Sequence, residues 1–143
     1  MEISILFLPL IASIISGFFG RYIGDRNSEI VTSTLVSISA LLSIYLLYQV
    51  IVNQYEENII IATWINSGSL DVNWSMLIDP LSAVMLVVVT FVSSLVHIYS
   101  IGYMSHDPHK PRFMAYLSLF TFAMLMLVTS DNFIQLFFGW EGV

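Results

Sequence analysis

The chain has 143 residues, of which 57% are hydrophobic and only 10% are charged, whereas a soluble domain carries about 25% charged residues. It contains no cysteine, which excludes disulfides, thiolate metal sites and cysteine nucleophiles in this stretch. Lysine and arginine total four against ten acidic residues, which argues against nucleic-acid binding, and the apolar composition predicts a membrane protein.

Apolar runs predict the helices. We expect helices, in chain order, at about 3–20, 30–52, 80–101, 113–130 and 133–143. The first four approach the length of about 20 residues that a spanning helix needs, and Pro9 marks a kink point in the first. The amino terminus lacks the basic region and cleavage site of a signal peptide, so the first helix is expected to be retained. The fifth is expected to be truncated, because eleven residues rise only about 16 Å.

Residues 59–78 are expected to form a β-hairpin on the outer surface. Apolar and polar residues alternate from Leu70 to Ile78, which is the period of a strand with one buried face. A β-branched run precedes them, and residues 66–69 have turn chemistry. The alternative is an irregular loop. The predicted fold class is an all-α polytopic membrane protein with four transmembrane helices, the start of a fifth, and an outer-side β-hairpin between helices two and three.

The basic residues indicate the orientation. All of them lie between helices one and two, at Arg21 and Arg26, or between helices three and four, at Lys110 and Arg112. Loops rich in lysine and arginine usually stay on the cytoplasmic or matrix side. We therefore expect the amino terminus and the 53–79 loop to face outward.

Glu141 is the leading candidate for chemistry. It is the only charged residue in 133–143, and a helix that begins near Phe133 would place it about 12 Å into the membrane. A carboxylate inside an apolar membrane segment is costly and usually marks an ion or proton path. Gly139 and Gly142 flank it and allow close helix approach or leave room for water. The alternative is a structural interhelical ion pair or hydrogen bond.

Three further residues are accessory candidates. His97 is the only Asp, Glu, His, Lys or Arg residue inside the first four predicted helices, and it is either a packing histidine or a proton relay. Asp79, followed by Pro80, has the form of a helix start. Asp131, followed by Asn132, fits an N-cap or, alternatively, an outer-side proton residue.

The segment from His106 to Pro111 is a weak candidate for a metal site. It contains two histidines and Asp107, but two prolines hold it extended and no third histidine or cysteine supports it. Lys110 and Arg112 are expected to set the orientation and to meet lipid headgroups. No Gly-rich phosphate loop or dinucleotide fingerprint occurs, and we expect this chain to bind no metal and no cofactor.

The motifs after residue 70 resemble those of one family. They are Asp79-Pro80-Leu81-Ser82, Val96-His97-Ile98-Tyr99-Ser100-Ile101-Gly102-Tyr103-Met104, Arg112-Phe113, Asp131-Asn132 and Phe138-Gly139-Trp140-Glu141-Gly142-Val143. Together they closely resemble the subunit L (chain 5) family of the proton-pumping NADH:quinone oxidoreductase, respiratory complex I. The resemblance extends over essentially the whole chain, with less specific motifs in the first two helices and the hairpin.

The resemblance implies that 1–143 is the amino-terminal part of one antiporter-like membrane domain, which moves protons while a separate arm oxidises NADH. It implies a proton-channel role for Glu141, with lysine partners on later helices of the family. It also implies the other membrane subunits of complex I and the lipid bilayer as partners. NADH, FMN, iron–sulfur clusters and quinone would be bound by other subunits. The membrane would be the bacterial inner membrane or, alternatively, the mitochondrial inner membrane.

Two other hypotheses stay open. The chain could belong to the large subunit of a multisubunit cation/proton antiporter, a family that shares the antiporter-like fold. It could also be an inactive truncated fragment.

Overall fold

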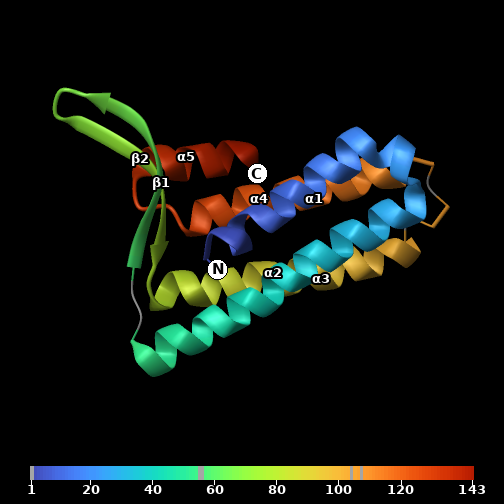
Figure 1. The fold of residues 1–143 in the computed structure, drawn as a ribbon, viewed down its shortest axis with the longest axis horizontal. Coiled ribbons are helices and arrows are strands. Elements are labelled where there is room, and N and C mark those ends of the chain that lie inside the picture. Colours follow the sequence, from blue (N-terminus) through green and yellow to red (C-terminus); the bar gives the residue numbers. More distant parts are fainter. Residues whose placement is uncertain (1, 55–56, 104, 107) are drawn as a thin grey trace.

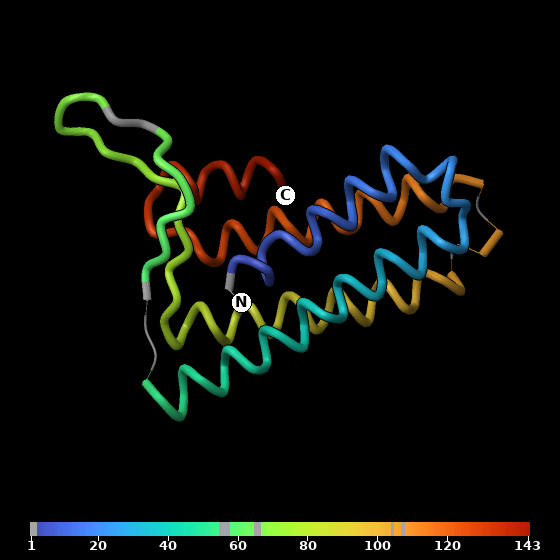
Figure 2. The backbone as a smooth tube through the Cα atoms, viewed as in Figure 1, coloured from blue at the N-terminus to red at the C-terminus, as the bar shows by residue number. Residues whose placement is uncertain are grey.

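In the computed structural model, four long helices form an antiparallel bundle that carries a β-hairpin and a short fifth helix at one end (Figure 1). The structure describes residues 2–54, 57–103, 105–106 and 108–143. The elements, in chain order, are α1 (Glu2–Ile23), α2 (Asp25–Asn53), β1 (Glu57–Ser67), β2 (Leu70–Ile78), α3 (Pro80–Tyr103), α4 (Lys110–Val128) and α5 (Phe133–Gly142). Figure 2 shows α5 turning back beside α4, at the same end as the hairpin.

The arrangement confirms the predicted fold class, because the structure is mostly helical with an antiparallel hairpin between α2 and α3. Helices α1 to α4 are each long and apolar enough to cross a membrane, with spans of 19 to 29 residues. Large apolar side chains such as Phe18, Leu41 and Val92 are exposed on the outside of the bundle. Helices that are apolar on their outer as well as their inner faces are typical of membrane spans. The chain is therefore an integral membrane protein.

Two helix starts differ from the prediction. The loop expected at 21–29 is reduced to Gly24, and α2 begins at Asp25 rather than near 30. Gly24 has φ +95° and ψ 161°, a backbone conformation that is essentially restricted to glycine, so a single residue reverses the chain. Helix α4 begins at Lys110 rather than at 113, because Pro111 is compatible with a first helical turn. At the starts of α2 and α4, the helix extends past the end of the apolar run and includes charged residues.

The hairpin pairs from Glu57↔Ile78 to Ser67↔Leu70, with two register shifts along its length. Its turn contains Gly68, which has φ +59°. The predicted inward face of β2 is largely confirmed, because Val72, Met76 and Ile78 are buried. Ser75 is the exception: the alternation places it on the polar face, yet it is fully buried. Gln135 of α5 covers it, as described below.

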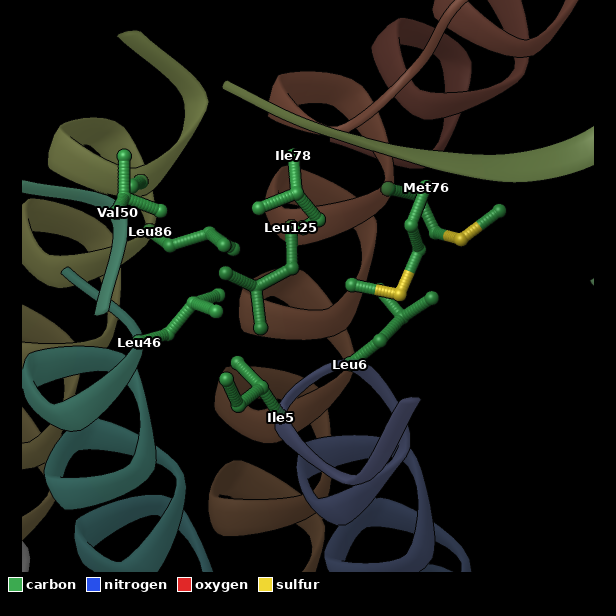
Figure 3. Packing of buried hydrophobic residues seen from close by; sticks show 10 residues of the cluster. Ile5, Leu6, Leu46, Val50, Met76, Ile78, Leu86 and Leu125 are labelled. Carbon is green, nitrogen blue, oxygen red and sulfur yellow. The ribbon is translucent and has the colours of Figure 1, made fainter. Parts of the chain in front are cut away.

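Buried aliphatic side chains gather at one end of the bundle, under the hairpin (Figure 3). They come from the start of α1, the end of α2, the start of α3, the end of α4 and from β2: Ile5, Leu6, Leu46, Val50, Met76, Ile78, Ala83, Leu86, Leu125 and Met126. We call this end of the molecule the hairpin end. The opposite end, which contains Gly24 and the connection between α3 and α4, is the loop end.

The loop end is instead rich in buried polar side chains, beside apolar ones such as Met114 and Ala115. Its buried members include Ser16, Ser28, Glu29, Thr32, Ser33, Ser94, His97, Ser100 and Ser118. Several hydroxyls donate to a carbonyl oxygen one turn earlier in their own helix, as Thr32 does to Ser28 at 2.8 Å and Ser100 does to Val96 at 2.7 Å. Hydroxyls thus occupy many of the interior positions at this end, whereas aliphatic side chains occupy most of them at the hairpin end.

Candidate functional site

Helix α5, which carries Glu141, begins at a side-chain cap. Asn132 Oδ1 accepts a hydrogen bond from the backbone N–H of Gln135 at 2.8 Å. The N-cap predicted for 131–132 is therefore at Asn132. The carboxylate of Asp131 accepts hydrogen bonds from Nδ2 of Asn58 and Nδ2 of Asn132, both at 2.9 Å. These contacts fix the start of α5 against β1.

Gln135 docks α5 on β2. Its side chain is fully buried, Nε2 donates to the carbonyl oxygen of Ser75 at 2.8 Å, and Oε1 accepts from the N–H of Ser75 at 3.0 Å. Its amide thus satisfies both backbone groups of one strand residue, as a neighbouring strand would. Asn132 adds a bond from Nδ2 to the carbonyl oxygen of Asn73 at 3.0 Å. Gln135 was not among the residues predicted from the sequence, although it is the one polar residue in the apolar run 133–138.

Aromatic rings extend this contact. Phe138 of α5 meets Trp74 of β2 edge-on, with ring centroids 4.8 Å apart. Trp74 in turn stacks on Trp64 of β1 at 4.2 Å. Such pairs add about 0.5–1.5 kcal/mol to the burial of the rings. The hairpin therefore holds one side of α5 through rings as well as hydrogen bonds.

Two glycines let α5 lie directly against α4. A Cβ at Gly139 would stand 2.8 Å from Cα of Leu127, and a Cβ at Gly142 would stand 2.9 Å from Cβ of Ala123. Both distances are too short for carbon atoms, so this approach requires residues without side chains. The close approach predicted for Gly139 and Gly142 is therefore confirmed.

Glu141 itself is exposed, on a side of α5 that does not face α4. Because α5 begins at Phe133, Glu141 lies about 12 Å along the helix. Within the part of the chain that the structure describes, no side chain or backbone group forms a hydrogen bond or ion pair with its carboxylate. The helix is fixed on two sides, and the carboxylate is presented on a third.

His97 is fully buried between α3 and α4 in the loop-end half of the bundle. Its Nδ1 lies 2.7 Å from the carbonyl oxygen of Ser93, and its Nε2 lies 3.0 Å from Oγ of Ser118. A neutral ring with the proton on Nδ1 donates to the carbonyl and accepts from the Ser118 hydroxyl, which satisfies both nitrogens. Oγ of Ser93 also lies 2.5 Å from Oγ1 of Thr121. These side chains connect α3 to α4, and a relay role for His97 stays a prediction.

The predicted site residues do not form one cluster. Asp79 caps α3 at the hairpin end, where its Oδ1 accepts from the N–H of Ser82 at 2.7 Å, as a helix start requires. Asp131 also lies at this end, whereas His97 lies in the other half. Met104 and Asp107, parts of the predicted family motif and of the weak metal site, lie outside the described residues.

The charge of Asp131 is stabilised by its neighbours. Partial burial acts to raise the pKa of this carboxyl, but hydrogen bonds to it, those from Asn58 and Asn132 among them, together outweigh burial and hold the pKa below its usual value. Asp131 is therefore ionised at neutral pH and serves as an acceptor between the hairpin and α5.

An ion pair at the loop end was also not predicted from the sequence. Glu29 on α2 is only 5% exposed, and its Oε1 lies 3.9 Å from Nζ of Lys110 at the start of α4. Burial of Glu29 was not predicted because residues 21–29 were expected to form a loop, in which a carboxylate is normally solvated. Glu29 lies four residues before Ser33 and seven before Val36, a spacing that places all three on one face of a helix. This spacing could have predicted that Glu29 is buried.

Comparison with known proteins decides the family. Residues 64–114 match the family model described as NADH-Ubiquinone oxidoreductase (complex I), chain 5 N-terminus. Over all 143 residues the chain is 57% identical to the NADH-ubiquinone oxidoreductase chain 5 of Arabidopsis thaliana and to that of Triticum aestivum. The chain belongs to the chain 5 family of complex I. It is also 52% identical, over 99% of its length, to the chain 5 of Phytophthora infestans, and it spans 21% of the length of each of these curated relatives.

Membership of the chain 5 family confirms the resemblance stated from the motifs. The family model covers Asp79 and His97, whereas Asp131 and Glu141 lie beyond its last matched residue. The family assignment around Glu141 therefore rests on the identity along the whole chain.

Proposed function

We propose that the full-length subunit contributes to proton translocation in the membrane arm of NADH:quinone oxidoreductase, with Glu141 as a proton-carrying group. The observation that carries this proposal is the placement of Glu141. Gln135 and Gly139 fix α5 against the hairpin and α4, while the carboxylate faces out of the bundle about 12 Å along the helix. The names of the relatives supply the enzyme class.

A carboxylate at this depth is costly while it is ionised and unpaired. It is less costly when it is protonated, or when a positive charge from another membrane element approaches it. Glu141 would therefore exchange its proton as its partner moves, and a rigid α5 would keep the exchange distance defined. The family resemblance supplies lysines on later helices as the partner.

The basic residues support an orientation. All four basic residues lie at the loop end: Arg21 is in the last turn of α1, Arg26 is in the first turn of α2, and Lys110 and Arg112 are in the first turn of α4. We place the loop end on the cytoplasmic or matrix side, with the hairpin and the amino terminus outside. The plant and oomycete relatives favour the mitochondrial inner membrane over a bacterial one.

The proposal includes the partners. The other membrane subunits of complex I and the lipid bilayer would contact the exposed apolar surface of the helices. NADH, FMN, iron–sulfur clusters and quinone would be bound by other subunits, and this chain would hold no cofactor.

Replacing Glu141 with Gln in the full-length subunit tests the proposal. The amide keeps the shape of the side chain but cannot release a proton, so we expect normal assembly, normal NADH oxidation with an artificial electron acceptor, and a reduced proton-to-electron ratio. Asp71→Asn removes an exposed carboxylate from the hairpin and serves as the matched control. An unchanged ratio in Glu141→Gln would overturn the assignment. Cation-coupled proton transport without NADH oxidation would favour the antiporter alternative.

A further inference from the structure

The buried face of α2 contains an ionisable residue that the proposed function does not use. At the loop end this face presents Ser28, Glu29, Thr32 and Ser33, all buried. At 100° per residue these four positions fall within an arc of about 140°, so they form one continuous surface toward the interior. Glu29 is only 5% exposed and lies between the hydroxyl residues on that surface.

Three polar atoms of this surface lack a hydrogen-bond partner in the protein. Within the described residues, Oε1 of Glu29, Oγ of Ser28 and Oγ of Ser33 are buried and make no hydrogen bond. Thr32 differs, because its hydroxyl donates to the carbonyl oxygens of Ser28 and Glu29. Buried polar groups in native proteins are nearly always hydrogen-bonded to the protein or to ordered water. Three such atoms within two turns of one helix indicate a site for water.

Lys110 supplies the charge that this site needs. Its Nζ lies 3.9 Å from Oε1 of Glu29, which is within range of an ion pair but too long for a direct hydrogen bond. A polar contact of this length accommodates a bridging water. Because Lys110 already balances the carboxylate, a metal cation would meet a repelling ammonium group here. The geometry therefore favours water over a metal ion.

The depth of Glu29 in the membrane also fits hydration. Helix α2 has 29 residues, so it is about 43 Å long and exceeds the hydrocarbon core of about 30 Å. If the helix is centred in the bilayer, Glu29 lies at the loop-end edge of the hydrocarbon region. Water from the adjacent compartment can reach this level.

We propose that Glu29 is a proton-exchanging carboxylate in a small hydrated site at the loop end. The hydroxyls of Ser28 and Ser33 bind water there, and the ammonium group of Lys110 balances the negative charge of the carboxylate. A hydronium ion at the loop end transfers its proton to the carboxylate, leaving water and a carboxylic acid, and the reverse step releases the proton. This inference rests on the proposed role of the subunit in proton translocation. It assigns a second exchange point to that role, on the side of the membrane opposite the hairpin.

Hydration is tested with single cysteines in the full-length subunit of the assembled complex. Residues 1–143 contain no cysteine, so Ser33→Cys and Ser43→Cys each place a single thiol in this segment, and modification is read on the peptide that carries it. Both positions are buried on the same face of α2, but Ser43 lies ten residues further toward the hairpin end. Aminoethyl methanethiosulfonate added from the loop-end side should modify Ser33→Cys about tenfold faster, because the thiolate needs water. If Ser33→Cys is modified at the same rate as Ser43→Cys, or is not modified at all, the proposal of a hydrated site is overturned.

Proton exchange is tested with Glu29→Gln and Glu29→Asp, and with Asp25→Asn as a control for an exposed acid of the same helix. Recovery of the variant subunit in the purified complex reports assembly. We expect Glu29→Gln to lower the proton-to-electron ratio about twofold or more, with Glu29→Asp restoring it and Asp25→Asn leaving it unchanged. A normal ratio in Glu29→Gln would overturn the proposal even if Ser33→Cys is modified. Failure of the broader proposal would appear separately, as normal pumping by Glu141→Gln.

Discussion

The hairpin end of the bundle packs mainly through aliphatic side chains, whereas the interior of the loop end is rich in hydroxyls carried by the same four helices. Along the buried face of α2, Ser28 and Thr32 at the loop end give way to Leu46 and Val50 at the hairpin end. The spacing of buried residues does not change between the two ends. Inside a bilayer the hydrophobic effect does not drive helices together, because lipid tails are as apolar as the side chains. Small residues that allow close approach and hydrogen bonds can therefore stabilise helix packing as effectively as aliphatic residues do.

The contrast separates two roles. The hairpin end is closed by β2 and α5, and α5 is fixed there by Gln135 and by the contact between Gly139 and Leu127. The loop end contains the ionisable interior residues His97 and Glu29. One end thus positions a helix, and the other end offers groups that can hold water or protons.

Gly139→Val should produce the largest effect, because it would separate α5 from the hairpin end. The new side chain would collide with the backbone of Leu127, which cannot move without displacing α4. We expect a loss of about 3 kcal/mol or more in stability, visible as a reduced yield of assembled complex and a lower temperature of inactivation. Gly102→Val is the control, since a Cβ there meets no atom within 4 Å. Equal effects of the two variants would refute the close contact.

Leu125→Ala tests whether the hairpin end is a packed core. Leu125 is fully buried, so its truncation leaves a cavity, and we expect a cost of about 2 kcal/mol in thermal or detergent unfolding. Leu119→Ala, on the same helix but 45% exposed, should cost less than about 0.5 kcal/mol. If both variants behave alike, the aliphatic cluster does not stabilise this end.

A double-mutant cycle measures how the loop end is held. His97→Leu and Ser118→Ala remove the two sides of one interhelical hydrogen bond, and we expect a coupling of about 0.6 kcal/mol in unfolding experiments. Ser100→Ala combined with Ser118→Ala is the control cycle, because the hydroxyl of Ser100 donates within its own helix. Its coupling should be near zero. A comparable coupling in both cycles would mean that the bond to His97 has no specific role.

Asp131 should give the smallest effect, as a pH dependence of the contact between the hairpin and α5. Its pKa is lowered in the folded protein, so its contribution to stability is present above the ordinary pKa of about 3.9 and is lost as the pH falls through the folded value. The carboxyl is largely exposed, which limits the contribution to about 0.3 kcal/mol. Thermal unfolding of wild type and Asp131→Asn should therefore differ at pH 7 and converge below pH 4. A constant difference would exclude ionisation as the cause.

Local patterns predicted much of the fold. Apolar runs located the four spanning helices, alternation located β2, and Asp79 and Asn132 cap helices as their types suggest. Contacts between distant segments were not readable. Gln135 forms hydrogen bonds with Ser75, sixty residues earlier in the chain. In the hydropathy pattern Gln135 is only one polar residue within an apolar run. Glu29 was assigned to a loop because charge ended the apolar run, whereas the helix extends beyond the hydrocarbon region.

The one-residue connection at Gly24 has a consequence for how the chain enters the membrane. The N–H of Gly24 bonds to the carbonyl oxygen of Gly20, and its own carbonyl accepts from Ser28, so hydrogen bonding continues from α1 into α2 almost without a break. Because no extended linker joins α1 to α2, α1 cannot move into the lipid while α2 is still held in the insertion machinery. The two helices should therefore be released into the bilayer together, as a single unit during synthesis.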